Sequence, residues 1–220
     1  MKPNYKAIVF DFDYTLGDST KAIVESMNYA LEKHGYQHRT TEEIRQTIGL
    51  DVEEALFRFE GYKEPEEQRR FVGYFVEKIN EIVAYDSTLY PDTEYVLRSL
   101  KEKGYKIAIV STKHDNQLVA ILDKFQAVNL VDMIVGSNNV KATKPDPEGL
   151  LKVLKEMNLT NEELLYVGDS FVDAKAAQNA RVRFAGVLTG TTKIETFEEY
   201  PHELIGETIA DIYQYILSQE

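Results

Sequence analysis

Five short runs of apolar residues, rich in β-branched and aromatic side chains, recur along the chain. They cover residues 5–10, 106–110, 133–135, 164–167 and 184–187. Continuous apolar runs of this length are typical of strands buried on both faces of a sheet. Helical spacing of apolar positions follows at residues 93–103, 116–125, 147–157 and 171–180. This alternation predicts an α/β fold, with a doubly wound, Rossmann-like parallel sheet between layers of helices.

The stretch between the first two runs, residues 17–84, carries helical patterns and no strand pattern. Its signals are an apolar stripe at Ile23, Met27, Ala30 and Leu31, capping-box spacing at Thr40 with Glu43 and at Asp51 with Glu54, and Pro65 before a stripe at Phe71, Phe75, Ile79 and Val83. We therefore expect an all-helical domain at residues 17–84, inserted into an α/β core of residues 1–16 and 85–220. The linkers at 16–20 and 85–91 would act as hinges.

Composition narrows the chemistry that the chain can perform. The 220 residues include no cysteine, which excludes disulfides, thiolate nucleophiles and zinc–thiolate sites. The four histidines lie far apart, so any metal would be held by carboxylates, which suit hard ions such as magnesium, Mg2+. A net charge of −12 without a basic cluster argues against nucleic acid and anionic lipid as partners. With no bilayer-spanning run and no signal-peptide pattern, we expect a cytoplasmic protein without membrane contact.

The first candidate site residues follow the first apolar run. Asp11 ends that run and Asp13 lies two positions later, so the two carboxylates can face the same side of an extended chain. Such a pair can supply a nucleophile and a general acid/base, and the first carboxylate can also hold a metal. Asp and Thr are equally typical of a turn that ends a strand, so this motif alone leaves both interpretations open.

Two further candidates follow the next runs. Ser111 and Thr112 come directly after residue 110, where a hydroxyl and neighbouring N–H groups can hold phosphate oxygens. Lys144 precedes Pro145, which disfavours helix at the lysine and presents it from an extended segment. Its ammonium could neutralise phosphate charge or orient a carboxylate. A helix cap and a solvated lysine are the ordinary alternatives for these residues.

The fourth candidate group follows the run at 164–167. Asp169 ends the strand and Asp173 lies one helical turn later on the same side. Converging carboxylates repel unless a proton or a cation lies between them, although an acidic first helical turn is also common. All four groups fall at carboxyl ends of predicted strands, where open α/β sheets place their ligand sites. Their combination favours a metal-dependent phosphoryl-transfer site over four unrelated turns.

These residues resemble the motifs of the haloacid dehalogenase-like hydrolase superfamily, in its branch with a helical cap after the first strand. The matching segments are Asp11-Phe12-Asp13-Tyr14-Thr15, Ser111-Thr112, Lys144, and Gly168-Asp169 with Asp173. The resemblance covers nearly the whole chain. The stretches Asp18-Ser19, Thr47-Ile48-Gly49, Tyr90-Pro91 and Lys144-Pro145-Asp146-Pro147 are most similar to phosphoglycolate phosphatases.

The resemblance implies a magnesium-dependent phosphate monoester hydrolase acting on a small phosphorylated metabolite, phosphoglycolate among the candidates. Asp11 would attack phosphorus, forming an aspartyl-phosphate, and would bind Mg2+. Asp13 would protonate the leaving alcohol, then activate water, and its backbone carbonyl would also bind the metal. Asp169 would complete the protein's metal ligands.

The remaining residues take supporting roles in the same resemblance. Ser111 and the backbone at Thr112 would bind the phosphoryl group that is transferred. Lys144 would link that group to Asp11. Asp173 and Thr15 would support the site without binding the metal themselves.

Two departures from the family pattern affect the expectations. Tyr14 stands where phosphatase members usually have glycine, so we expect a different backbone position and an aromatic ring near the entrance. Arg181 replaces a common glycine after the last motif, which concerns packing. The presence of Asp13 argues against carbon–halogen chemistry, because dehalogenases lack an acid/base aspartate at this position.

Several alternatives stay open on the sequence. A sugar-phosphate mutase similar to β-phosphoglucomutase, a pyrophosphatase or nucleotidase of the superfamily, and a non-catalytic binding protein on the same scaffold share these motifs. Cap residues would set the substrate, with Arg45 as one candidate. Lys113, His114 and Asn116 could line the entrance, or lie on a solvated loop. The oligomeric state cannot be derived from the sequence.

Overall fold

The structure is a computed structural model and describes residues 4–220. The chain divides into two compact units, one of residues 1–18 and 89–220 and one of residues 19–88. Two short strands, β2 (Gly17–Asp18) and β3 (Thr88–Leu89), pair where the chain passes from one unit to the other. β2 falls inside the stretch predicted to have no strand, so that part of the prediction was wrong.

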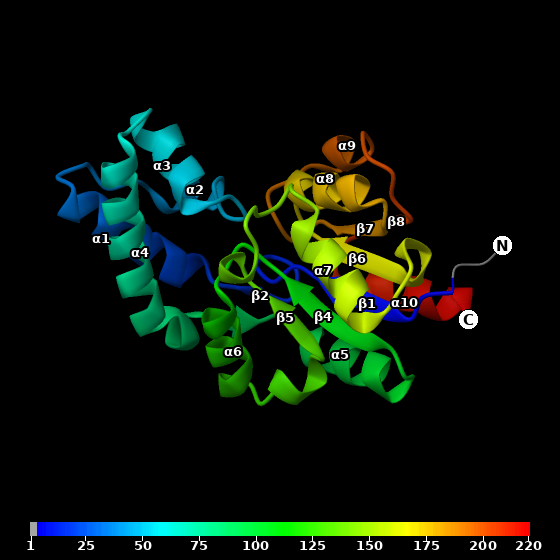
Figure 1. Cartoon of the computed structure of the whole chain (residues 1–220). Coiled ribbons are helices and arrows are strands. Elements are labelled where there is room, and N and C mark those ends of the chain that lie inside the picture. The colour runs from blue at the N-terminus through cyan, green and yellow to red at the C-terminus, as the bar shows by residue number, and fades with distance from the viewer. Residues whose placement is uncertain (1–3) are drawn as a thin grey trace. The chain divides into compact units, whose positions relative to one another are not determined.

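The larger unit is built on a six-stranded sheet with the order β5-β4-β1-β6-β7-β8 (Figure 1). Every neighbouring pair is parallel. The strands are β1 (Ala7–Phe10), β4 (Lys106–Val110), β5 (Met133–Val135), β6 (Leu164–Gly168), β7 (Arg183–Val187) and β8 (Leu204–Gly206). The five predicted strands are present, and β8 extends the sheet beyond them. The α/β fold with a Rossmann-like parallel sheet is confirmed.

Helices cover both faces of this sheet (Figure 1). On one face, α5 (Thr93–Glu102) and α10 (Ile209–Gln219) pack against each other and against β4, β7 and β8. On the other, α7 (Glu148–Met157) and α8 (Phe171–Ala180) pack against each other and against β4 to β7. α6 (Asp115–Lys124) packs against β5, and α9 (Ile194–Phe197) against α8. Short 3-10 turns η1 (Val128–Leu130), η2 (Ser137–Asn139) and η3 (Asn161–Glu163) complete the connections.

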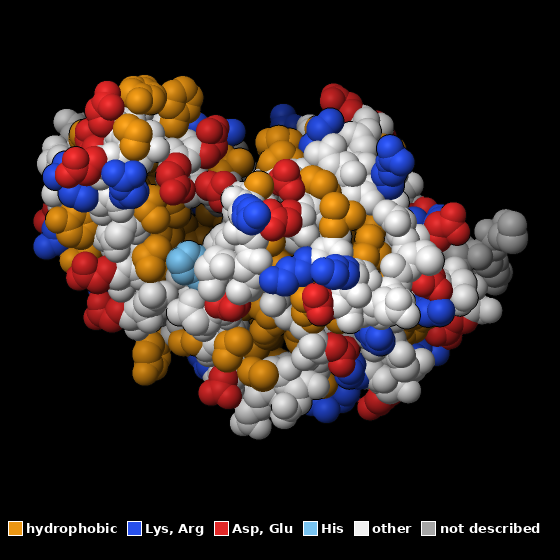
Figure 2. All heavy atoms as spheres, viewed as in Figure 1, with side chains coloured by type: hydrophobic (Ala, Val, Ile, Leu, Met, Phe, Trp, Pro, Cys, Tyr) orange, Lys and Arg blue, Asp and Glu red, His pale blue; other side chains and the backbone are white. Residues whose placement is uncertain are grey.

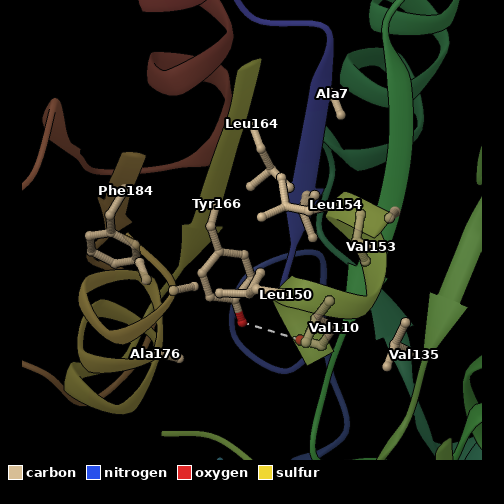
Figure 3. Packing of buried hydrophobic residues seen from close by; sticks show 14 of the residues in the cluster. Ala7, Val110, Val135, Leu150, Val153, Leu154, Leu164, Tyr166, Ala176 and Phe184 are labelled. Atoms are coloured by element: carbon tan, nitrogen blue, oxygen red, sulfur yellow. Dashed lines mark hydrogen bonds between the residues drawn. The ribbon is translucent and has the colours of Figure 1, made fainter. Parts of the chain in front are cut away.

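The core beneath α7 and α8 explains why the sequences of the sheet strands are continuously apolar. All four residues of β1 and all five of β6 are buried, because helices cover both sides of the sheet. Figure 3 shows Tyr166 of β6 standing among Leu150, Leu154 and Phe184, with its hydroxyl directed at the carbonyl oxygen of Val110. Each fully buried side chain of this size contributes about 1.5–3 kcal/mol through removal from water.

The smaller unit consists of four helices and short connections in the described residues. They are α1 (Thr20–Lys33), α2 (Thr41–Arg45), α3 (Val52–Glu60) and α4 (Pro65–Asp86), with α1 packed along α4. The two predicted apolar stripes are buried, and Pro65 opens α4. The capping box of Thr40 and Glu43 is present.

The second predicted capping box is absent. Asp51 occupies the N-cap of α3 but makes no capping hydrogen bond. Glu54, the expected partner, instead accepts from Arg58 Nε at 3.2 Å on the same helix face. None of the helices in residues 4–220 is long and apolar enough to cross a membrane. In Figure 2 acidic and basic side chains are interspersed over the face in view.

Candidate active site

Three neighbouring strands end at one edge of the sheet and bring the predicted motifs together. β1 lies between β4 and β6, and Asp11, Ser111 and Asp169 directly follow these strands. The ladder continues to this edge: Asp11 N donates to Val167 O at 2.9 Å and Ser111 N donates to Val135 O at 3.0 Å. Both residues are therefore fixed by main-chain hydrogen bonds before their side chains make any contact.

Lys144 connects the first and last motifs. Its Nζ lies 2.8 Å from Asp11 Oδ1 and 2.6 Å from Asp173 Oδ1, and it donates to the Tyr166 hydroxyl at 3.1 Å. All three acidic and basic side chains are at least 96% buried. Burial acts to lower the pKa of Lys144, but the carboxylates of Asp11 and Asp173 outweigh it and raise that pKa. The lysine is thus charged at neutral pH, in contact with the predicted nucleophile.

Asp173 uses both of its carboxylate oxygens for contacts within the protein. Oδ2 accepts from Ser170 N at 3.1 Å and from Ser170 Oγ at 2.6 Å, forming the capping box that starts α8. Oδ1 faces Lys144 and also lies 2.8 Å from the Tyr166 hydroxyl. A Cβ at Gly168 would come within 2.5 Å of Asp173 Cβ, so only glycine leaves room for this carboxylate. Asp173 therefore holds Lys144 in place and has little capacity for another ligand.

Buried carboxylates gather at this edge in excess of cations. Single oxygens of Asp11, Asp169 and Asp173 all lie within 4.8 Å of one another. Burial raises the pKa of Asp11 to about 6, Lys144 opposes the shift and Asp173 adds to it. Burial, then Asp173 and Asp11, raise the pKa of Asp169 well above its usual value. The group therefore fits a hard divalent cation, which would relieve this repulsion through oxygen ligands.

Asp13 pairs with a second buried lysine. Lys113 Nζ lies 2.7 Å from Asp13 Oδ2, and the two side chains are 6% and 7% exposed. Asp13 Oδ1 is buried and makes no hydrogen bond within residues 4–220. Of the two alternatives given for Lys113, the solvated loop is therefore wrong, because the residue is 7% exposed. The turn after Ser111 directs its side chain inward, and Lys113 N donates to Ser111 Oγ at 3.3 Å.

Tyr14 and Thr15 complete the turn that follows β1. Tyr14 adopts a φ of 59°, the left-handed region that glycine favours, and its ring is 3% exposed. The backbone thus has the conformation expected for glycine at this position, and the ring is buried. Thr189 Oγ1 donates to the Tyr14 carbonyl, and Thr15 Oγ1 donates to Asp169 Oδ1 at 3.3 Å. These two hydrogen bonds connect the first motif to the segments that follow β6 and β7.

The remaining sequence candidates differ in where they lie. Thr112 is partly buried beside Ser111, His114 is the partly buried N-cap of α6, and Asn116 is exposed. Arg45 belongs to the other unit, where its guanidinium lies 3.7 Å from Glu42. Arg181 takes a left-handed conformation at the end of α8, with a φ of 57°, a conformation that glycine adopts at less cost than other residues.

Three contributors were not found from the sequence. The sequence pattern places Tyr166 only in a strand, although a tyrosine within a fully buried strand needs a partner for its hydroxyl, which is a usable signal. Ser170 precedes Asp173 by three residues, the spacing of a capping box with an acidic partner. Gly190 lies so close to Asp169 that a Cβ there would overlap the carboxylate, and no local pattern predicts this approach.

Comparison with known proteins gives consistent results. The family model described as haloacid dehalogenase-like hydrolase matches residues 8–187. Phosphoglycolate phosphatase of Aquifex aeolicus is 31% identical over 191 residues, covering 87% of this chain and 88% of that protein. Pyrophosphatase PpaX of Listeria monocytogenes is 29% identical over 221 residues, covering 97% of each. A crystal structure described as a haloacid dehalogenase-like hydrolase from Bacteroides fragilis superposes with a TM-score of 0.91 at 36% identity, over 94% of this chain and 99% of that one.

Proposed function

Because this chain belongs to the haloacid dehalogenase-like hydrolase family and is a phosphatase, we propose that it hydrolyses small phosphate monoesters through an aspartyl-phosphate on Asp11, with Mg2+ as cofactor. The observation that carries this proposal is the ion pair of Asp11 with Lys144 at 2.8 Å, both buried at the carboxyl edge of the sheet. A paired carboxylate with a pKa of about 6 is mostly ionised at neutral pH, as a nucleophile must be.

In the first step, an oxygen of Asp11 forms a bond to phosphorus while the bond from phosphorus to the leaving oxygen breaks. Asp13 donates its proton to that oxygen, so the alcohol leaves neutral. Lys144 balances the charge on the phosphoryl group, and the Ser111 hydroxyl with the main-chain N–H at Thr112 hold its oxygens.

In the second step, Asp13 accepts a proton from water, and the water oxygen attacks phosphorus. The bond between phosphorus and Asp11 breaks, which regenerates the Asp11 carboxylate and releases phosphate. Asp13 holds one proton again and can serve the next turnover. The proposal therefore assigns opposite proton transfers to one residue in the two steps.

The metal would be held by Asp11, Asp169 and the backbone carbonyl of Asp13. This assignment is supported by the raised pKa values of Asp11 and Asp169 and by the full use of the Asp173 oxygens in other contacts. Mg2+ bound there supplies positive charge that screens the phosphoryl oxygens from the attacking carboxylate. Thr15 and Asp173 would support the site without ligating the metal.

For the substrate, we propose a small phosphorylated metabolite, and phosphoglycolate first, from the similarity to the Aquifex aeolicus enzyme. Inorganic pyrophosphate is the second candidate, because the Listeria monocytogenes relative is a pyrophosphatase and the match covers 97% of each chain. We further propose that the helical unit, residues 19–88, which overlaps the insertion expected at 17–84, serves as the cap that selects the substrate.

Phosphate release from a panel of esters tests this proposal. Phosphoglycolate, sugar phosphates, nucleotides and pyrophosphate are compared with Mg2+ and with a chelator, for wild type, Asp11→Asn and the control Asp123→Asn, an exposed carboxylate on α6. We expect metal-dependent release in wild type and control, and a loss of about a thousandfold or more in Asp11→Asn. Full activity in Asp11→Asn would refute the mechanism.

A further inference from the structure

Two lysines are buried among residues 4–220, and each pairs with one aspartate of the first motif. Lys144 contacts Asp11, and Lys113 contacts Asp13. Burying an ammonium group is costly unless a partner of opposite charge meets it in good geometry. The role of the first pair follows from the chemistry of the nucleophile, whereas the second pair requires its own explanation.

The backbone of Lys113 is held by hydrogen bonds at both its N–H group and its carbonyl oxygen. Its N–H donates to Ser111 Oγ at 3.3 Å, and its carbonyl oxygen accepts from Ser137 N at 2.9 Å. A Cβ at Gly136 would come within 2.6 Å of that carbonyl, so this approach depends on glycine. The side chain therefore starts from a rigid point between the ends of β4 and β5, and its ammonium reaches Asp13 without a flexible loop.

The two oxygens of Asp13 are consequently unequal. Oδ2 is held by Lys113 at 2.7 Å, whereas Oδ1 is buried and makes no hydrogen bond within the described residues. A carboxyl group rotates easily about its last torsion, so a single strong contact at one oxygen decides where the other points. The oxygen without a partner is the one left for proton exchange with the leaving group and with water.

We propose that Lys113 is a positioning residue for Asp13, which holds Oδ2 so that Oδ1 faces the reacting oxygen. The proposal rests on the acid/base role of Asp13 in the proposed function. Lys113 itself neither gives nor takes a proton in this scheme. Its contribution is to keep the carboxyl group of Asp13 in one orientation during both steps.

The test is the dependence of kcat/KM on the leaving group, because this ratio reports the first irreversible step. Esters of 2,4-dinitrophenol, 4-nitrophenol and phenol, with the best alkyl phosphate of the panel, are compared in wild type, Lys113→Met and Lys113→Arg. A leaving group that departs without protonation does not need Asp13, whereas an alcohol does. Lys113→Met should therefore lose about 10–100-fold on the alkyl ester and less than about threefold on the dinitrophenyl ester. The slope of log kcat/KM against leaving-group pKa should steepen, and Lys113→Arg should restore it in large part.

Controls separate the possible outcomes. Asp13→Asn gives the slope without the acid, Lys124→Met tests an exposed lysine on α6, and circular dichroism verifies that each variant is folded. An equal loss on every ester, with the wild-type slope, would overturn the proposal and make Lys113 a substrate-binding or structural residue. If wild type hydrolyses none of the esters, the proposed function has failed instead, which is a different result from an active enzyme with an unchanged slope.

Discussion

Replacing Tyr166 with phenylalanine would remove one oxygen atom from the centre of the site. The hydroxyl is fully buried, lies 2.8 Å from Asp173 Oδ1, 3.2 Å from Val110 O, and accepts from Lys144 at 3.1 Å. Burial, then Asp173, raise the pKa of Tyr166 well above its usual value, so the group is a neutral donor at neutral pH. The variant keeps the ring and its packing, so hydrogen bonding is the only property that changes.

A hydrogen bond to a charged acceptor contributes about 1.5–3 kcal/mol, and leaving buried acceptors unpaired adds a cost of the same order. We therefore expect Tyr166→Phe to lower the free energy of unfolding by about 2 kcal/mol and Tm by about 4–8 °C in a chain of this length. Activity should fall less than about tenfold, because Lys144 keeps its contacts to Asp11 and Asp173.

Thermal and urea unfolding of the purified protein, together with phosphate release, measure both effects. Tyr105→Phe is the matched control, because the Tyr105 hydroxyl donates to exposed Glu220 at 3.2 Å, and its loss should cost less than about 0.5 kcal/mol. Equal stability of the two variants would show that the buried hydroxyl contributes nothing beyond an exposed one. The contacts of the Tyr166 hydroxyl with Asp173 and Lys144 would then not stabilise the fold.

Three further predictions address the turn, the metal and pH. Gly190→Ala places a Cβ against the Asp169 carboxylate, so the Kd for Mg2+ by calorimetry should rise at least about tenfold, while an unchanged Kd would contradict the close approach. Tyr14→Gly relieves a positive φ worth about 1 kcal/mol but loses a buried ring worth about 3–5 kcal/mol, so urea unfolding should show a net loss of about 2–4 kcal/mol, and a more stable variant would refute this balance. Asp11 has a pKa of about 6 in the fold against an ordinary 3.8, so the folded state binds more protons and the contribution of Asp11 to stability falls as pH rises from about 4 to 6. Mg2+ should therefore raise Tm more at pH 7.5 than at pH 5.5, and equal shifts at both pH values would count against Asp11 as a ligand.

The parts of the fold and site that could be predicted are those that local pattern determines. Asp11 and Asp169 end apolar runs, and parallel pairing then brings them to one edge. Lys113 could not be placed in this way, because its direction depends on the turn after β4 and on the close approach of Gly136, which are tertiary features.

The omissions among the elements have two different causes. Helix α10 carries Ile209, Ile212, Tyr213 and Ile216 at helical spacing behind a Thr208 cap, so the sequence does contain the pattern of this helix. Strand β8 has only three residues, two of them half-buried, and too short a run to distinguish from a loop. The capping box predicted at Asp51 is a different case: it is absent because Glu54 pairs with Arg58 instead.

The two buried lysines have a consequence for how an anion can enter this protein. The chain as a whole carries a net charge of −12, so its long-range field repels a phosphate ester. At the site, the carboxylates of Asp11, Asp13, Asp169 and Asp173 lie close to Lys113 and Lys144, and when all four are ionised they exceed the two ammonium groups by the charge of one divalent cation. With such a cation bound, and with Asp13 carrying the proton that the first step requires, the site has no excess of negative charge, so capture of the substrate depends on short-range contacts after diffusion has brought it there. Dissolved salt, which screens the distant charges far more than the buried ones, should therefore favour encounter without weakening the bound state.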